Sequence, residues 1–279
     1  DESHVQRPVD GLTLFFTDLD RSKVETRVID KMGRKCVDSN QMFIDGLEIP
    51  VENRIGEEGQ GFKYLLHGIN PERILIAAGL VGLGRAALRR ATAYAKERVV
   101  FGRPIGMNQA IQHPLAQSWA ELEAANLMAF RAAQLYDRGE DCGAMANAAK
   151  YLAGEASFNA CTNAVITHGG MGCAKEYHVE RYLRECLIHR IAPITPHLIL
   201  CYIAERVLGQ WIRGQLILGL SVGLATFAGL LVLDVTVENR KIVRYDGRLI
   251  QLWFHNDRPP SRLSAFVDSV QNVIDREYT

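Results

Sequence analysis

Residues 70–99 carry one long helical pattern, and its apolar character leaves few folds open to the chain. Asn70 is a good N-cap, because its side-chain oxygen can accept a hydrogen bond from a free backbone N–H group of the first turn. Pro71 suits the first helical position, and Glu72 follows where the positive end of the helix dipole favours a carboxylate. From Ile74 onward the run is almost wholly apolar and rich in small residues. We therefore expect a buried helix that packs closely against other helices.

The rest of the chain before residue 210 predicts a partial β-domain followed by an up-and-down helical bundle. Strands are expected over residues 12–17, 24–29 and 41–44, which are too few for an independent barrel. Further helices are expected over residues 108–138, 142–168, 179–186 and 196–208. Short connections between such helices are typical of bundles, so the fold class is mainly α.

The character of the sequence changes after residue 209. The uncharged run at 216–233 is just long enough for a transmembrane helix, and a buried core helix explains it equally well. A β-hairpin and a helix are expected in the tail that follows. We therefore divide the chain into a partial β-domain (1–57), a bundle (58–209), an apolar helix (210–235) and a small α+β tail (236–279).

Composition limits the partners and the compartment. The formal net charge is +0 with no sustained basic run, so nucleic acid is not an expected partner. The six cysteines contain no C-x-x-C pair, and the eight histidines form no metal-like cluster. We assign no metal. Scattered reduced thiols indicate a cytoplasmic protein, with membrane association possible only through 216–233.

Glu72 and Arg73 are the first candidates for chemistry. A carboxylate beside a guanidinium at the mouth of a buried apolar helix is suited to proton abstraction. The alternative is that the two residues form an exposed surface pair that contributes little. Asn70 likewise has a sufficient role as a helix cap.

Three segments together resemble the C-terminal helical domain of the acyl-CoA dehydrogenases, and the resemblance covers residues 10–209. It depends on the R-x-x-F-G-R-P-I turn, a glutamine downstream of it, and an H-G-G-M-G turn, in that order along the chain. The three segments are Gly68–Ala78, Glu97–Ile105 and Thr167–Gly172.

The resemblance implies a flavoenzyme that oxidises an acyl-CoA thioester to the 2,3-enoyl-CoA, with a carboxylate as base for the α-proton. The loop that carries this base in many members matches Arg190–Thr195, which has no carboxylate, and the base position falls on Pro193. In the isovaleryl-type and long-chain-type branches the base precedes an arginine on the long helix, as Glu72 precedes Arg73. The resemblance therefore implies Glu72 as base and Arg73 as its partner or an anchor for the thioester. We expect Glu72 to face a groove beside His168 and Gly169.

The resemblance also implies contacts to FAD and to the substrate. Arg98 and Phe101 match residues that meet the FAD pyrophosphate and adenine, usually of a neighbouring subunit, and Gln109 matches a further adenine contact. Gly169 and Gly170 would let the backbone approach the dinucleotide, although a helix C-cap alone would explain a glycine there. Asn70 matches a position near the CoA moiety. The implied partners are an acyl-CoA, a second copy of the chain in a homo-oligomer, and an electron-transfer flavoprotein as electron acceptor.

Two departures from the family's pattern lead to further expectations. The chain begins inside what is the middle β-barrel of the family, so we expect it to bind FAD weakly or not at all. Residues 211–235 weakly resemble a membrane segment of the autoinducer-2 exporter family, and a fused reading frame is an alternative explanation. The rival function is a non-catalytic scaffold or membrane-associated interaction protein that uses the same bundle.

Overall fold

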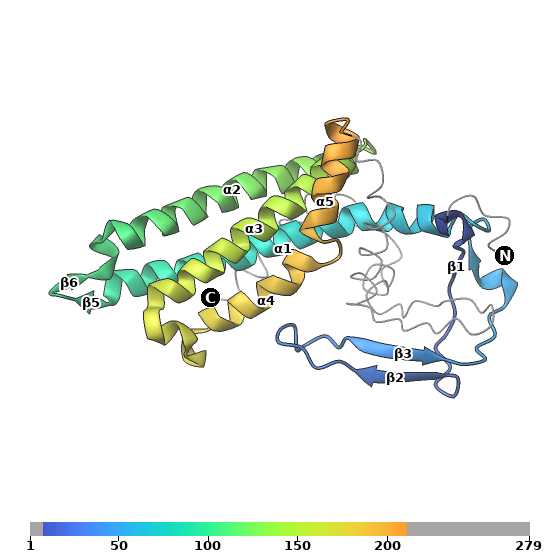
Figure 1. Cartoon of the computed structure of the whole chain (residues 1–279), viewed down its shortest axis with the longest axis horizontal. Helices are drawn as coiled ribbons and strands as arrows, with labels where there is room; N and C mark the ends of the chain where they lie inside the picture. Colours follow the sequence, from blue (N-terminus) through green and yellow to red (C-terminus); the bar gives the residue numbers. More distant parts are fainter. Residues whose placement is uncertain (1–7, 211–279) are drawn as a thin grey trace. The chain divides into compact units, whose positions relative to one another are not determined.

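The structure is a computed structural model that describes residues 8–210, so the predicted apolar segment at 216–233 and the tail at 236–279 lie outside the described residues. The described chain is mainly helical, which confirms the predicted fold class (Figure 1). It divides into two units. The first contains residues up to Asp30 together with Val37–Ile69, and the second contains Lys31–Cys36 together with the chain from Asn70 onward. The division into four domains stays a prediction.

The first unit contains two small antiparallel strand pairs. Strand β2 (Val24–Val28) pairs with β3 (Asn40–Ile44), which confirms two of the predicted strands. Strand β1 (Leu14–Phe15) is shorter than predicted and pairs with β4 (Arg54–Ile55), which was not predicted. β4 is hidden in the sequence because a 3₁₀ turn precedes it and Gly56, with φ +70°, ends it at once. The 3₁₀ turns of this unit are η2 (Pro8–Gly11) and η3 (Val51–Asn53).

The long helix α1 spans Gly61–Glu97, so the predicted start at Asn70 is wrong. The apolar spacing that begins at Phe62 continues without a break, and Pro71 lies inside the helix. A proline there leaves the carbonyl of His67 without its usual i+4 donor, a local loss that a 37-residue helix tolerates. The side chain of Asn70 accepts from Arg73 Nη1 at 2.9 Å instead of capping the helix.

The predicted bundle is confirmed, with differences at its later helices. The helix predicted over 179–186 extends to Ile191, and the last one ends at Tyr202, followed by a single π turn at Ile203–Val207. The remaining helices are α2 (Gln109–Asp137), α3 (Gly143–His168), α4 (Val179–Ile191) and α5 (Pro196–Tyr202). A hairpin of β5 (Val99–Val100) and β6 (Arg103–Pro104) joins α1 to α2. The 3₁₀ turns of this unit are η4 (Ile105–Met107), η5 (Gly169–Cys173) and η6 (Lys175–Tyr177).

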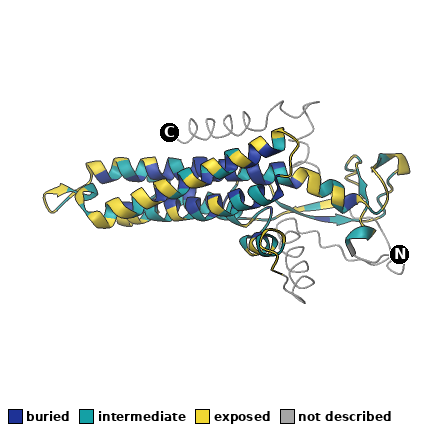
Figure 2. Cartoon of the chain, turned by 90° about the horizontal axis from the view of Figure 1, so that it is seen from above, coloured by how far each residue is buried: buried dark blue, intermediate teal, exposed yellow. Residues whose placement is uncertain are grey.

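Small residues form most of the bundle core. Figure 2 shows buried positions along the facing sides of the long helices. The fully buried alanines of this core include Ala77, Ala87, Ala91, Ala125, Ala129, Ala149 and Ala153. A Cβ added to Gly84 of α1 would lie 2.5 Å from Leu122 Cδ2 and 3.3 Å from Ser157 Cα, so this glycine sets the spacing of α1, α2 and α3. The expected close helix packing is therefore present.

Two glycines of α1 test this packing. We expect Gly84→Ala to destabilise the protein by about 1–3 kcal/mol, because the new methyl group overlaps Leu122. Gly68→Ala is the matched control, because nothing lies within 4 Å of its added Cβ. Alanine lowers the conformational entropy of the unfolded chain, so this substitution should stabilise the protein by about 0.5–1 kcal/mol. Urea unfolding measures both changes. Equal effects of the two substitutions would contradict the role of Gly84 in helix spacing.

By length and composition alone, the segment Val179–Val207 is apolar enough to cross a membrane. Its helices are interrupted between Ile191 and Pro196, and it contributes Tyr182, Cys186 and Ile199 to the buried set. It is therefore weak evidence for a membrane span, because a core helix meets the same criteria.

Candidate active site

Glu72 lies on α1, and its side chain is partly buried. Desolvation by burial raises the pKa of its carboxyl, while the charges of Arg73 and then Arg34 act in the opposite direction. Burial disfavours the charged form, and nearby cations favour it. A carboxylate with a raised pKa is a stronger base than an exposed one. Glu72 therefore has the electrostatic properties that a general base requires.

Arg73 is 7% exposed, so the reading of Glu72 and Arg73 as a surface pair is wrong. Its Nη1 donates to Asn70 Oδ1 at 2.9 Å, and its buried Nε has no hydrogen-bond partner. Desolvation lowers the Arg73 pKa to about 10, against the opposing effects of Tyr202, Glu72 and Cys142. The guanidinium thus points into the bundle and keeps an unused donor there.

Arg34 and His189 belong to the same region, and sequence reasoning missed both. Arg34 Nη1 lies 3.0 Å from His189 Nε2, and His189 Nδ1 lies 3.3 Å from the carbonyl oxygen of Glu185. Because a guanidinium can only donate, Nε2 must accept and Nδ1 must carry the proton. Burial, and then the charge of Arg34, lower the His189 pKa to about 4. His189 is therefore neutral near pH 7.

Lys150 of α3 is a third residue that the sequence did not identify. It is 1% exposed, and its Nζ donates to the carbonyl oxygens of Arg190 (2.6 Å) and Ile194 (2.8 Å). Arg190 lies in the last turn of α4 and Ile194 lies within the α4–α5 connection, the loop without a carboxylate. Desolvation, and then the charge of Arg73, lower the Lys150 pKa to about 7. Lys150 thereby holds this connection against α3.

The predicted cofactor residues gather at the opposite end of the bundle, around the β5–β6 hairpin and the end of α3 (Figure 1). Arg98 and Gln109 are exposed, and Phe101 is fully exposed with φ 53°. Gly169 has φ +60° and donates its N–H to the carbonyl of Ile166, so it is the C-cap of α3. No atom lies within 4 Å of a Cβ added to Gly169 or Gly170. The backbone at these glycines is therefore open to a ligand.

His168 also lies at this far end. Its ring stacks on Tyr94 of α1 with centroids 4.2 Å apart, and burial lowers its pKa. Tyr94 is 22 residues beyond Glu72, or about 33 Å along a helix that rises about 1.5 Å per residue. The expectation that Glu72 faces a groove beside His168 and Gly169 is therefore wrong. The base candidate and the cofactor candidates are therefore far apart along α1.

Comparison with known proteins identifies the family. Residues 59–207 match the model of the acyl-CoA dehydrogenase C-terminal domain. The acyl-CoA dehydrogenase FadE12 of Mycobacterium tuberculosis is 46% identical over 171 residues, which are 61% of this chain and 44% of that protein. An acyl-CoA dehydrogenase of Bacillus subtilis is 39% identical over 179 residues, covering 64% of this chain and 47% of the relative.

Solved structures agree. Butyryl-CoA dehydrogenase from Megasphaera elsdenii superposes with a TM-score of 0.70 at 30% identity, covering 74% of this chain and 54% of that one. The chain spans about half the length of the curated relatives it matches. The matched region contains the whole bundle and both groups of candidate site residues. The chain belongs to the acyl-CoA dehydrogenase family, through its C-terminal domain.

Proposed function

We propose that this chain takes part in the α,β-dehydrogenation of an acyl-CoA thioester, with Glu72 as the general base. The observation that carries the proposal is the partly buried Glu72 carboxylate on α1, whose pKa burial raises against the charges of Arg73 and Arg34, in a member of this family. An α C–H group is weakly acidic, so its base must be stronger than an exposed carboxylate. Glu72 takes the α-proton on its carboxylate oxygen and becomes neutral.

The neighbouring residues have supporting roles. The α4–α5 connection offers no carboxylate, so it cannot supply the base from its usual place. The guanidinium of Arg73, which donates to Asn70, is the positive charge next to Glu72 in the sequence. Its unpaired Nε can donate to the thioester oxygen of the substrate or to the Glu72 carboxylate. Asn70 uses its Oδ1 for Arg73, which leaves the amide NH₂ free to contact the CoA moiety.

The end of the bundle that carries the β5–β6 hairpin is suited to contact a dinucleotide bound mainly by a second copy of the chain. Arg98, Phe101 and Gln109 are exposed, and Gly169 and Gly170 have open space where a side chain would project. A guanidinium fork such as that of Arg98 suits a diphosphate. FAD, when bound, supplies the acceptor for the hydride that leaves the β-carbon. Arg98 would hold its pyrophosphate, and Phe101 and Gln109 would contact its adenine.

The separation of the two groups supports a homo-oligomer. Arg98 follows the end of α1, about 38 Å along the helix from Glu72. One extended dinucleotide does not span that length. Glu72 of one copy and Arg98 of another would therefore serve the same FAD molecule.

Relatives support the choice of electron acceptor. CarC of Acetobacterium woodii, 35% identical over 182 residues, is a subunit of a caffeyl-CoA reductase–Etf complex. An electron-transfer flavoprotein is accordingly the proposed partner that reoxidises the flavin of this protein.

The test is flavin reduction by substrate. We expect FAD absorbance to bleach without oxygen when acyl-CoA thioesters are added to the purified chain at saturating FAD, with formation of the enoyl-CoA. Arg98→Ala should raise the Kd for FAD about tenfold, because a charged hydrogen bond to the pyrophosphate is lost. Arg138→Ala, which removes an exposed arginine paired with Glu140, is the control. A protein that remains colourless at high FAD and makes no enoyl-CoA would support the scaffold alternative.

A further inference from the structure

We propose that a cluster of three rings positions the turn η5 (Gly169–Cys173) relative to Arg98. The rings are those of Tyr94, His168 and Tyr177, and we refer to them as the ring cluster. This role deepens the proposed function and rests on it for the identity of the ligand, FAD. The ring contacts themselves stand independently of any reaction.

Each pair of rings in the ring cluster is in contact. His168 stacks on Tyr94 with centroids 4.2 Å apart and planes at 23°. Tyr177 packs edge-on against both rings, with centroid distances of 5.6 Å to Tyr94 and 5.4 Å to His168. Stacked and T-shaped arrangements are the favoured geometries of aromatic pairs. The three rings therefore form one packed unit.

Two of the rings lie at the ends of the connection between α3 and α4. His168 is the last residue of α3 and Tyr177 is the last residue of η6, so η5 lies between them. His168 Nδ1 donates to the carbonyl oxygen of Ala164 at 2.7 Å, which fixes the ring on its own helix. A Cβ on Gly172 would overlap the carbonyl oxygen of Val165, so the turn folds back closely on α3.

Tyr94 joins this connection to the side of α1 that leads to Arg98. Arg90, Tyr94 and Arg98 follow one another at intervals of four residues, so they lie along one side of the helix. The backbone N–H of Arg98 donates to the carbonyl oxygen of Tyr94 at 2.8 Å, which continues the helical pattern past Glu97. Arg90 Nε donates to the Tyr182 hydroxyl of α4 at 2.9 Å. This side of α1 thus meets α4 first and the ring cluster one turn later.

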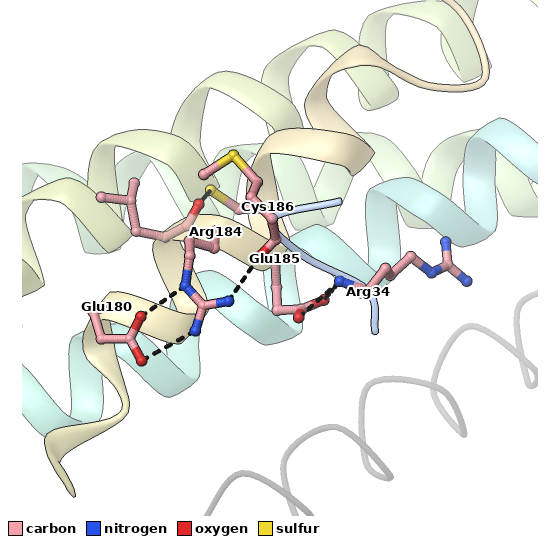
Figure 3. Close-up of polar contacts among 7 residues, drawn as sticks. Arg34, Glu180, Arg184, Glu185 and Cys186 are labelled. Carbon is pink, nitrogen blue, oxygen red and sulfur yellow. Dashed lines mark hydrogen bonds and ion pairs between the residues drawn. The ribbon is translucent and has the colours of Figure 1, made fainter. Parts of the chain in front are cut away.

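α4 is fixed by other contacts as well. Both carboxylate oxygens of Glu180 accept from Arg184, at 2.7 and 3.1 Å (Figure 3). Arg184 Nη1 donates to the carbonyl oxygen of Met32 at 2.7 Å, and Glu185 accepts from the backbone N–H of Arg34. None of these contacts involves a ring of the ring cluster. Loss of the Tyr94 ring should therefore loosen the α3–α4 connection while α4 stays in place.

The ring cluster matters for FAD because the proposed contacts come from two separate segments. Gly169 and Gly170 would meet the dinucleotide through their backbone, and Arg98 through its guanidinium. A ligand that has to order two loose segments binds more weakly, since the ordering costs free energy. The ring cluster holds the α3 segment against the α1 segment before the ligand arrives. It therefore pre-organises this part of the FAD site.

Tyr94→Leu is the informative variant, because it removes the ring that contacts both other members and keeps an apolar side chain. Tyr94→Phe retains the ring and is the rescue variant. Tyr136→Leu is the matched control, since it removes a partly buried tyrosine ring in the last turn of α2, at the other end of that helix from the hairpin. We expect amide hydrogen exchange of the segment 169–177 to be about tenfold faster in Tyr94→Leu, because two ring contacts are lost.

Exchange of the segment 149–160, within α3, reports the stability of the bundle and serves as the internal reference. The ratio of the two exchange rates should rise in Tyr94→Leu and stay at the parent value in Tyr94→Phe and Tyr136→Leu. A parent-like ratio in Tyr94→Leu would overturn the proposal, because the rings would then stabilise only the bundle as a whole.

Titration with FAD tests the consequence for the cofactor. We expect the Kd for FAD to rise about three- to tenfold in Tyr94→Leu and to stay at the parent value in the other two variants. A looser turn with an unchanged Kd would overturn the positioning role. A parent protein that binds no FAD would overturn the proposed function, while the exchange experiment, which needs no ligand, still decides whether the ring cluster holds the turn.

Discussion

Replacing Glu72 with glutamine is expected to slow flavin reduction by acyl-CoA by about 10²- to 10⁴-fold. Glutamine has nearly the same shape and cannot accept the α-proton, so binding of FAD should remain while chemistry is lost. Stopped-flow bleaching at saturating FAD and substrate measures the rate. Glu140→Gln, an exposed carboxylate paired with Arg138, is the control. Bleaching of Glu72→Gln at the parent rate would refute Glu72 as base.

The same substitution has a second expected result, in stability. The Glu72 pKa is raised in the folded protein, so the folded state retains the carboxyl proton to higher pH than the unfolded state does. The parent protein therefore loses stability as pH rises through the folded pKa. We expect Glu72→Gln to be more stable than the parent at pH 7 and to lose this advantage below the ordinary value of 4.5. Chemical unfolding across pH measures the difference.

Replacing Lys150 with methionine is expected to destabilise the protein by about 3 kcal/mol at pH 9. The substitution keeps most of the volume and leaves the carbonyls of Arg190 and Ile194 without donors, each at a cost of about 1–3 kcal/mol. Urea unfolding measures the loss, and Lys96→Met, at an exposed position of α1, is the control. An unchanged midpoint at pH 9 would show that Lys150 does not hold the α4–α5 connection.

The cost should depend on pH in a defined direction. The Lys150 pKa falls from 10.5 to about 7 on folding, so the unfolded state binds the extra proton between these values. The contribution of Lys150 is full above about pH 10.5 and is lost as pH falls through about 7. The difference between the parent protein and Lys150→Met should therefore shrink from pH 9 to pH 6. A constant difference would mean that Lys150 stays protonated throughout.

The bundle could be predicted because its signals are local. α2 and α3 repeat apolar residues at helical spacing, and each ends at a glycine, Gly139 or Gly169, with positive φ. The start of α1 was misplaced because Pro71 has the sequence properties of a first helical residue. Pro71 lies inside α1 because the apolar residues before it continue the same helix. In the sequence, the same pattern also fits two separate helices that meet at Pro71.

Candidate site residues could be named from the sequence only where a motif marked them, and their roles stay predictions. Glu72 follows from its place before Arg73, and Arg98 and Phe101 from their turn. Arg34 and His189 are 155 residues apart in sequence, and no local pattern marks either residue. Lys150 interrupts an alanine-rich helix, and its carbonyl partners become known only when α4 and α5 are in place.

The length of α1 has a genetic consequence. If the two groups of site residues, far apart along one helix, serve different copies as proposed, each catalytic centre draws on two copies of the chain. A lesion near Glu72 and a lesion near Arg98, carried on separate alleles, would leave some mixed assemblies with an intact centre. Inactivating alleles along this helix should then fall into two complementation groups, one with lesions near Glu72 and the other with lesions near Arg98.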